Sequence, residues 1–127
     1  MVICSLGFDL IDLAHFEIHY GEDDPELLLR CFTAQEIAAA GDGVDRVARL
    51  AARYAVKEAT FKAFGGAANI SHLDIETVSG KDGAPQIRLS GAAEDAASAH
   101  GITSFIVSIS HSAASAGAVV IGLAGPR

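Results

Sequence analysis

Residues 46–66, with the sequence RVARLAARYAVKEATFKAFGG, restrict the fold most strongly, because they predict one long helix that ends at a glycine pair. At helical spacing, one apolar face collects Val47, Leu50, Ala51, Tyr54, Ala55, Phe61 and Gly65. Glu58 falls in the middle of this face, and Lys62 lies beside it one turn later. Since a carboxylate among apolar residues is costly unless it is paired or binds something, we expect Glu58 and Lys62 to mark a functional site.

A basic flank runs along the same predicted helix. It comprises Arg46, Arg49, Arg53 and Lys57, and together with Lys62 it holds five of the chain's nine Lys and Arg residues. Most charge runs of this kind are solvated helix faces, and that interpretation stays open. Because Arg suits phosphate recognition, we expect an anionic ligand here. The helix is apolar on several sides, so we also expect it to be covered by its own fold or by another subunit.

Length and charge limit the classes of protein that this chain can represent. Its 127 residues predict a single domain, 1–127, with a core of its own. The net charge of −7 argues against general nucleic-acid binding and against an anionic membrane surface. Residues 101–126 contain no Asp, Glu, Lys or Arg, but their serines, His111 and alternating pattern indicate two buried strands rather than a membrane span.

The two cysteines, Cys4 and Cys31, lie in no CxxC or His-rich cluster, so a zinc site has no support. We interpret both as small buried hydrophobic residues in a reducing compartment. The N-terminus lacks the basic segment of a signal peptide, and Asp9 and Asp12 interrupt its short apolar run. We therefore expect a soluble, cytoplasmic protein.

The order of the predicted elements is typical of an α+β fold with a mainly antiparallel sheet. A strand over 1–9 precedes a helix over 10–20, for which Asp9 is either the N-cap or a functional ligand. Pro25 follows an acidic turn and opens a short helix, and Thr33 with Glu36 predicts a capping box for a helix that ends near Gly41. After the long helix come strands 70–79 and 86–90 around a turn at 80–85, a helix over 91–100 ended by Gly101, and strands 105–110 and 116–123.

Asp9 and Glu58 are the two carboxylates that we expect to point inward from regular elements. Such oxygen ligands, completed by water and substrate phosphates, suit Mg²⁺. An ordinary i,i+4 ion pair between Glu58 and Lys62 is the alternative, and the spacing alone leaves both open. Ser110 and His111 end a predicted strand, but a Ser/His hydrolase is disfavoured because no GxSxG turn is present. His111 is better explained as a residue that hydrogen-bonds a ligand, or as one satisfied at a hairpin turn, and the other four histidines show no metal-ligand spacing.

Several of these segments resemble, in the same order, the motifs of the holo-[acyl-carrier-protein] synthases, the small single-domain 4′-phosphopantetheinyl transferases. Residues 53–65, RYAVKEATFKAFG, are very similar to the family's helix signature. Residues 7–9 resemble its first-strand G-x-D motif, and residues 32–36 match its F-T-x-x-E segment. Residues 83–85 match its G-x-P hairpin, and residues 108–112 match its S-x-S/T-H region. The resemblance covers nearly the whole chain and implies an antiparallel sheet packed on one long central helix.

The resemblance implies an enzyme that transfers the 4′-phosphopantetheine arm of coenzyme A to a serine of an apo acyl carrier protein, with Mg²⁺ and release of 3′,5′-ADP. Asp9 and Glu58 would hold Mg²⁺ on the pyrophosphate, and Glu58 or a metal-linked water would help to deprotonate the serine. Lys62 would stabilise or protonate the leaving phosphate. The coenzyme A site would be lined by Arg53, Lys57, Gly65, Ser110 and His111. Family members are trimers with active sites between subunits, and they serve fatty acid biosynthesis. The alternative is a coenzyme A- or carrier-binding protein of the same fold without efficient transfer.

Residues 14–24 depart from the family pattern, in which the helix after the G-x-D motif commonly carries arginines that bind an acidic carrier protein. Here the segment reads AHFEIHYGEDD, which contains no Lys or Arg and is acidic. A strongly acidic carrier would be repelled by this charge. We therefore predict a less acidic or dedicated carrier, held through apolar contacts with Phe16 and Tyr20.

Overall fold

The computed structural model describes residues 1–21 and 24–125 and confirms the predicted α+β fold. Within these residues, five strands form two antiparallel sheets rather than one. The larger sheet has the order β1 (Val2–Asp12), β5 (Ser115–Ala124) and β4 (Ser104–His111). The smaller sheet is a hairpin of β2 (Ile75–Ser79) and β3 (Pro85–Leu89). Residues 101–126 were expected to form two buried strands. Up to residue 125, β4 and β5 confirm the strands, but only β5 contains buried residues, and residue 126 lies outside the described residues.

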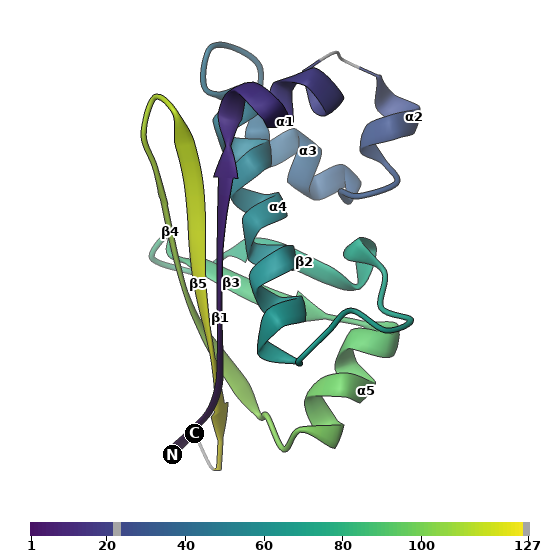
Figure 1. The fold of residues 1–127 in the computed structure, drawn as a ribbon, viewed down its shortest axis with the longest axis vertical. Helices are drawn as coiled ribbons and strands as arrows, with labels where there is room; N and C mark the ends of the chain where they lie inside the picture. The colour runs from purple at the N-terminus through teal and green to yellow at the C-terminus, as the bar shows by residue number, and fades with distance from the viewer. Residues whose placement is uncertain (22–23, 126–127) are drawn as a thin grey trace.

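The predicted long helix is the central element of the fold. Figure 1 shows α4 (Arg46–Ala63) lying along one face of the three-stranded sheet. The remaining helices lie on the same side of that sheet: α1 (Leu13–Tyr20), α2 (Pro25–Leu28), α3 (Ala34–Ala40), η1 (His72–Asp74) and α5 (Gly91–Ala99). Among the helices of the described residues, none has both the length and the apolar sequence needed to cross a membrane.

Small residues allow α4 to approach the sheet closely. Ala55 and Ala59 are fully buried and pack with Val120 of β5. Gly7 of β1 faces the same helix, and a Cβ atom there would lie only 1.7 Å from the carbonyl oxygen of Ala59. Glycine is therefore required at this position for close approach, and β1 carries its next inward-facing residue, Asp9, to the side of α4.

The other face of the three-stranded sheet has no helix over it in the part of the chain that the structure describes (Figure 1). It exposes more than half of the surface of Leu6, Phe8 and Leu10 on β1 and of Ile106 on β4. We call these four residues the apolar outer face. The apolar sides of α4, which we expected to be covered by the chain's own fold or by another subunit, are covered by the three-stranded sheet, α3 and β2 of the same chain. The apolar surface left open is thus on the sheet and not on the helix.

The first strand is longer than predicted. β1 continues to Asp12, and Asp12 caps α1 by accepting a hydrogen bond from the His15 amide at 3.0 Å. The interpretation of Asp9 as a helix N-cap was therefore wrong, because pairing with β5 extends the strand past it. Residues 70–74 were also assigned wrongly to a strand, since residues 70–71 have no regular structure and residues 72–74 form η1.

Other local predictions can be compared directly. The Thr33 and Glu36 capping box at α3 is confirmed, and so are the β2–β3 hairpin and the glycine after α5. The cysteines were expected to be buried, but Cys4 is exposed and Cys31 is only partly buried. Residues 22–23 of the predicted acidic turn lie outside the described residues.

Candidate functional site

An ion pair between Lys62 and Asp9 joins α4 to β1. Lys62 Nζ donates hydrogen bonds to Asp9 Oδ1 and to the carbonyl oxygen of Phe8, both at 2.9 Å. More than half of the Lys62 side chain is exposed, whereas the Asp9 side chain is largely buried. The close approach that Gly7 permits brings these two side chains together. Lys62 therefore pairs with β1 and not with Glu58, the alternative that the i,i+4 spacing had left open.

Glu58 lies one turn before Lys62 and has a partner of its own. Its Oε2 atom lies 2.9 Å from Nε2 of His72, which comes from η1. The Glu58 side chain is 34% exposed and the His72 side chain 29%, so both reach solvent. They border a cavity of about 460 Å³ that is also lined by Phe61, Lys62, Gly65, Gly66 and Ala67. We call this cavity the Glu58 pocket.

Tyr54 precedes Glu58 by one turn of α4. Burial raises the pKa of its hydroxyl, and the negative charges of Glu58, Cys31 and Asp9 raise it further. Its ring also stacks on the His72 imidazole, with 5.2 Å between centroids and 15° between planes. Because Lys62 lines the Glu58 pocket and pairs with Asp9, the structure brings Asp9, Glu58 and Lys62 together at the C-terminal half of α4.

The donor set at this position fits Mg²⁺ that is bound together with a phosphate ligand. Mg²⁺ is usually held by one or two carboxylates, while water and substrate phosphates complete its octahedron. Asp9 and Glu58 supply two such carboxylates. Within residues 1–21 and 24–125, no group of three or more His, Cys, Asp and Glu side chains could hold a metal ion alone. A closed structural zinc site, which needs four ligands, has no counterpart among these residues.

Arg53 lies on the opposite flank of α4, because five residues turn the helix by about 140° relative to Glu58. It lines a second cavity, of about 330 Å³, with Arg49, Thr77, His111 and two residues of the β2–β3 hairpin, Gly83 and Pro85. We call this cavity the Arg53 pocket. Arg53 Nε and Thr77 Oγ1 are buried and have no hydrogen-bond partner among the described residues. Unpaired polar atoms that line a cavity are expected where a ligand completes the bonding.

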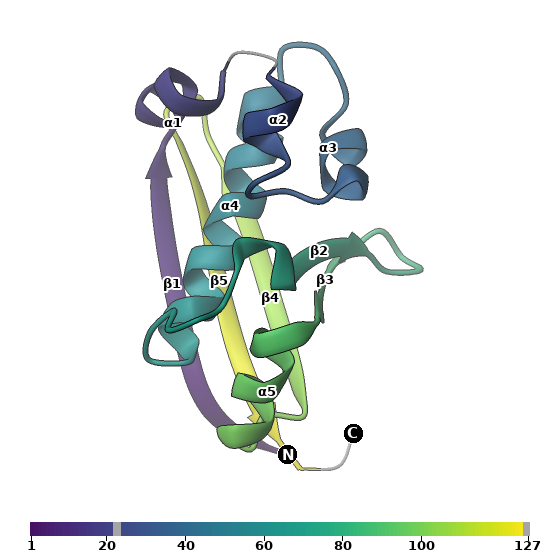
Figure 2. The ribbon, with the colours of Figure 1, turned by 90° about the vertical axis from the view of Figure 1, so that its right-hand side faces the viewer.

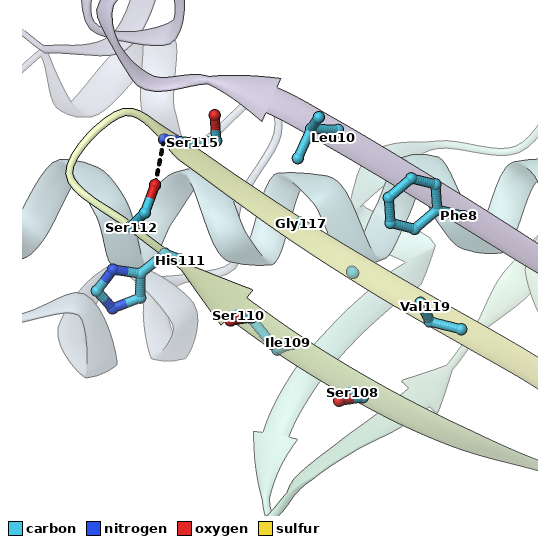
Figure 3. Close-up of a pocket in the computed structure, with 11 residues that line it drawn as sticks. Phe8, Leu10, Ser108, Ile109, Ser110, His111, Ser112, Ser115, Gly117 and Val119 are labelled. Carbon is cyan, nitrogen blue, oxygen red and sulfur yellow. Dashed lines mark hydrogen bonds between the residues drawn. The ribbon is translucent and has the colours of Figure 1, made fainter.

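Ser110 faces a shallower hollow of about 310 Å³ beside the apolar outer face. Figure 3 shows Phe8 and Leu10 on β1 and the serines Ser108 and Ser110 on β4, with β5 and its Val119 between the two strands. His111 borders both this hollow and the Arg53 pocket. Neither cavity shares a lining residue with the Glu58 pocket. The residues that the sequence assigned to one site therefore form two separate groups in a single chain.

Lys57 belongs to neither group, which corrects its predicted place on a basic, ligand-facing flank. The side chain is fully buried, and Nζ donates to Glu36 Oε1 at 2.8 Å, to the carbonyl of His72 at 2.8 Å and to the carbonyl of Ile75. Burial lowers the pKa of Lys57, and the charge of Glu36 opposes that shift. These three acceptors use all three ammonium donors, so Lys57 has no hydrogen left for a ligand.

The exposed surface of α1 also differs from the prediction. Phe16 is buried in the core, and Tyr20 is half-buried with its hydroxyl 3.6 Å from Cys31 Sγ. Burial raises the pKa of Tyr20, and the neighbouring thiol adds to this. The large apolar residue that α1 does expose is Ile18, at 78%, and Glu17 lies beside it on the surface. The predicted contact of a carrier with Phe16 was therefore wrong.

His72 is the residue of the Glu58 pocket that the sequence did not reveal. It lies 14 positions after Glu58, and no spacing rule connects the two. The contact arises because the chain turns back after Gly65 and Gly66, which take φ values of 80° and 150°, and returns η1 to the side of α4. The one sequence signal for this contact is that a histidine follows the glycine pair within a few residues.

The chain is similar in sequence and in fold to known proteins. A family model described as the 4′-phosphopantetheinyl transferase superfamily matches residues 5–116. The chain is 37% identical to the holo-[acyl-carrier-protein] synthase of Clavibacter michiganensis, over 94% of this chain and 95% of that protein. The structure of Helicobacter pylori holo-[acyl-carrier-protein] synthase in complex with coenzyme A aligns with a TM-score of 0.79 at 31% identity, covering 93% of this chain and 99% of the other. That of the Bacillus anthracis synthase in complex with CoA (3′,5′-ADP) gives 0.79 at 28% identity, covering 98% and 100%.

Proposed function

This chain belongs to the 4′-phosphopantetheinyl transferase superfamily and, within it, to the holo-[acyl-carrier-protein] synthases. We therefore propose that it transfers the 4′-phosphopantetheine arm of coenzyme A to a serine of an apo acyl carrier protein. The observation that carries this proposal is that Glu58 and Lys62 line one pocket and that Lys62 is paired with Asp9. Phosphoryl transfer depends on charge neutralisation and alignment, which two carboxylates and an ammonium group can supply.

In the proposed reaction, the serine oxygen attacks the phosphorus that carries pantetheine, and the bond from that phosphorus to the bridging oxygen of the pyrophosphate breaks. Glu58 accepts the serine proton, directly or through a water molecule. Lys62 neutralises the charge on the leaving 3′,5′-ADP. Two of its three donors are used by β1, which leaves one for that phosphate. Mg²⁺, held by Asp9 and Glu58, would supply further neutralisation of the pyrophosphate.

We propose that coenzyme A is bound by the Arg53 pocket together with Gly65. The guanidinium of Arg53 is suited to phosphate, and its unpaired Nε supports a ligand there. His111 borders the same pocket, and Ser110 is its neighbour on β4. Gly65 lines the mouth of the Glu58 pocket, where the lack of a side chain leaves the backbone open to a ligand. Lys57 is left out because its donors are all engaged.

The separation of the two groups supports an assembly of several copies. One coenzyme A molecule would contact both groups if the Glu58 pocket of one subunit faced the Arg53 pocket of the next. The apolar outer face supplies surface that such an assembly would bury. We propose the homotrimer that the family resemblance implies. A Phe8→Glu substitution should then convert it to monomers in light scattering after gel filtration, while Glu94→Gln on α5 should leave the mass unchanged.

The rest of the proposal follows the family resemblance: a role in fatty acid biosynthesis or a specialised synthase pathway, and a cytoplasmic location. The carrier is proposed to be less acidic than usual, because the exposed face of α1 carries Glu17 and has no Lys or Arg. This acidic surface also favours a second candidate, a coenzyme A- or carrier-binding protein without efficient transfer.

Mass spectrometry of the carrier separates the two candidates. The protein is incubated with coenzyme A, Mg²⁺ and apo carriers of graded charge, and each carrier is weighed. A gain of one phosphopantetheine that is lost in Glu58→Gln, but not in the control Glu94→Gln, would support transfer and identify the tolerated carrier. Bound coenzyme A with no gain on any carrier would favour the binding protein instead.

A further inference from the structure

We propose that His72 is a positioning residue that holds the Glu58 carboxylate in one orientation for the transfer reaction. The inference rests on the proposed function and adds to it a residue that acts through Glu58 and does not itself touch the reacting atoms. It starts from the 2.9 Å contact between His72 Nε2 and Glu58 Oε2.

The direction of this hydrogen bond follows from the chemistry of the two groups. An ionised carboxylate only accepts hydrogen bonds, so the hydrogen lies on His72 Nε2 and is donated to Glu58 Oε2. The bond occupies one carboxylate oxygen. Within the described residues, the other oxygen, Oε1, has no hydrogen-bond partner. Glu58 thus has one oxygen held by His72 and one oxygen left for a ligand.

The imidazole ring is itself held on two sides. It stacks on Tyr54 and meets Phe61 edge to face, with 5.0 Å between centroids and 76° between planes. Ser71 and Asp74 form a capping box around η1, which fixes the backbone that carries the ring. A donor held in this way loses little freedom when it binds the carboxylate, so the bond favours one Glu58 rotamer.

The buried Lys57 ties the same segment to α4 through the main chain. Its Nζ donates to the carbonyl oxygen of His72, while the neighbouring residue on the helix, Glu58, accepts from the His72 ring. Consecutive residues of α4 therefore hold the backbone and the side chain of one histidine. This arrangement explains why a lysine is buried so close to the site without facing a ligand.

A fixed carboxylate is of value here because Glu58 is proposed both to bind Mg²⁺ and to accept a proton. Groups that orient metal-binding side chains typically change metal affinity or activity by about 10–100-fold when they are removed. A residue that only filled space would be replaced without such a loss by another ring of similar shape. This difference allows the two roles to be separated.

Two substitutions separate the N–H donor from the ring. His72→Phe keeps a ring that can stack on Tyr54 but removes the donor, whereas His72→Gln keeps an N–H donor but removes the ring. His100→Phe is the matched control, since His100 stacks on Phe64 at 6.0 Å and 19° and is exposed outside the Glu58 pocket. For each variant, kcat and KM for coenzyme A are measured, together with Mn²⁺ affinity by electron paramagnetic resonance with coenzyme A present.

We expect His72→Phe to lose about 10–100-fold in kcat and about tenfold in Mn²⁺ affinity, with little change in KM. His72→Gln should recover most of both losses, and His100→Phe should match the wild type. If His72→Phe does not fold, His72→Gln is compared with His72→Met, which is similar in size and lacks a donor, and the same differences are expected.

In one outcome, the wild type transfers the arm while the donor-free variant stays within about twofold of it in kcat and Mn²⁺ affinity. That result would overturn the role of His72 but not the proposed function. A wild-type protein that transfers nothing to any carrier would overturn the proposed function, and this inference with it.

Discussion

Replacing Gly7 by alanine should separate β1 from α4 and weaken both the fold and the site. The added Cβ atom would lie 1.7 Å from the carbonyl oxygen of Ala59, 2.7 Å from its carbonyl carbon and 3.0 Å from the amide nitrogen of Ala63. All three atoms belong to the helix backbone, so no side chain can rotate away. Moving the closest contact from 1.7 Å to an acceptable 3.0 Å requires at least 1.3 Å of displacement.

The magnitude follows from what resists this displacement. β1 is paired with β5 without interruption from Ser5 to Asp12, so the strand cannot move at Gly7 without straining the sheet. Overpacking in a core costs about 1–3 kcal/mol and occasionally more, and the rigid backbone contact places Gly7→Ala at about 3 kcal/mol of lost unfolding free energy. With a urea dependence of about 2 kcal/mol per molar, the unfolding midpoint should fall by about 1.5 M.

Gly117→Ala is the control for the urea experiment. It makes the same chemical change on the neighbouring strand, where the nearest atom to the new Cβ lies 3.4 Å away, and it reduces the freedom of the unfolded chain equally. We expect its midpoint to change by less than about 0.5 M at the same chain concentration. Equal midpoints for the two variants would refute the claim that Gly7 sets the distance between strand and helix.

Three further predictions concern charge. Lys57→Met leaves Glu36 buried without its cation and should lower the free energy of unfolding, measured in urea, by about 3–5 kcal/mol. Adding Glu36→Gln should restore part of this loss. A Lys57→Met variant as stable as the wild type would contradict the pairing. Burial raises the pKa of Glu76, but the hydrogen bonds that it accepts and the charge of Arg88 outweigh burial and lower its pKa below the ordinary 4.5. The stabilisation that ionised Glu76 provides is therefore complete above pH 4.5 and is lost as the pH falls through its lower pKa in the folded protein. Arg88→Met should flatten the acid side of a plot of melting temperature against pH. An unchanged plot would argue against the interaction between Arg88 and Glu76. Glu17→Arg should raise transfer to an acidic carrier several-fold in kcat/KM, and an unchanged rate would remove α1 from the docking surface.

The features that could be predicted are those written in local patterns. The helical period of residues 46–63 predicts α4, and the Thr33 and Glu36 spacing predicts the cap of α3. Gly7 and Asp9 are two positions apart, so on a strand they share a face, and a glycine there permits the approach that places the carboxylate near Lys62.

The features that could not be predicted depend on contacts between distant residues. Lys57 lies at the edge of a helix that is apolar on several sides, and its direction is decided by Glu36, 21 positions earlier. Asp9 was assigned to the end of a strand because its pairing with Ala118 on β5 is invisible to local spacing. His72 reaches Glu58 only because the chain turns back after α4.

If neighbouring copies complete the site, the apolar outer face makes the folding of one chain and the completion of its chemistry separate events. A newly synthesised chain can bury its core around α4 before it meets another copy, but Phe8 and its neighbours would still face water. If neighbouring copies complete the site, turnover per chain should rise with chain concentration and decline with a delay after dilution. The length of that delay would then report how long the subunits stay together, which links the amount of enzyme that a cell makes to the activity of each molecule.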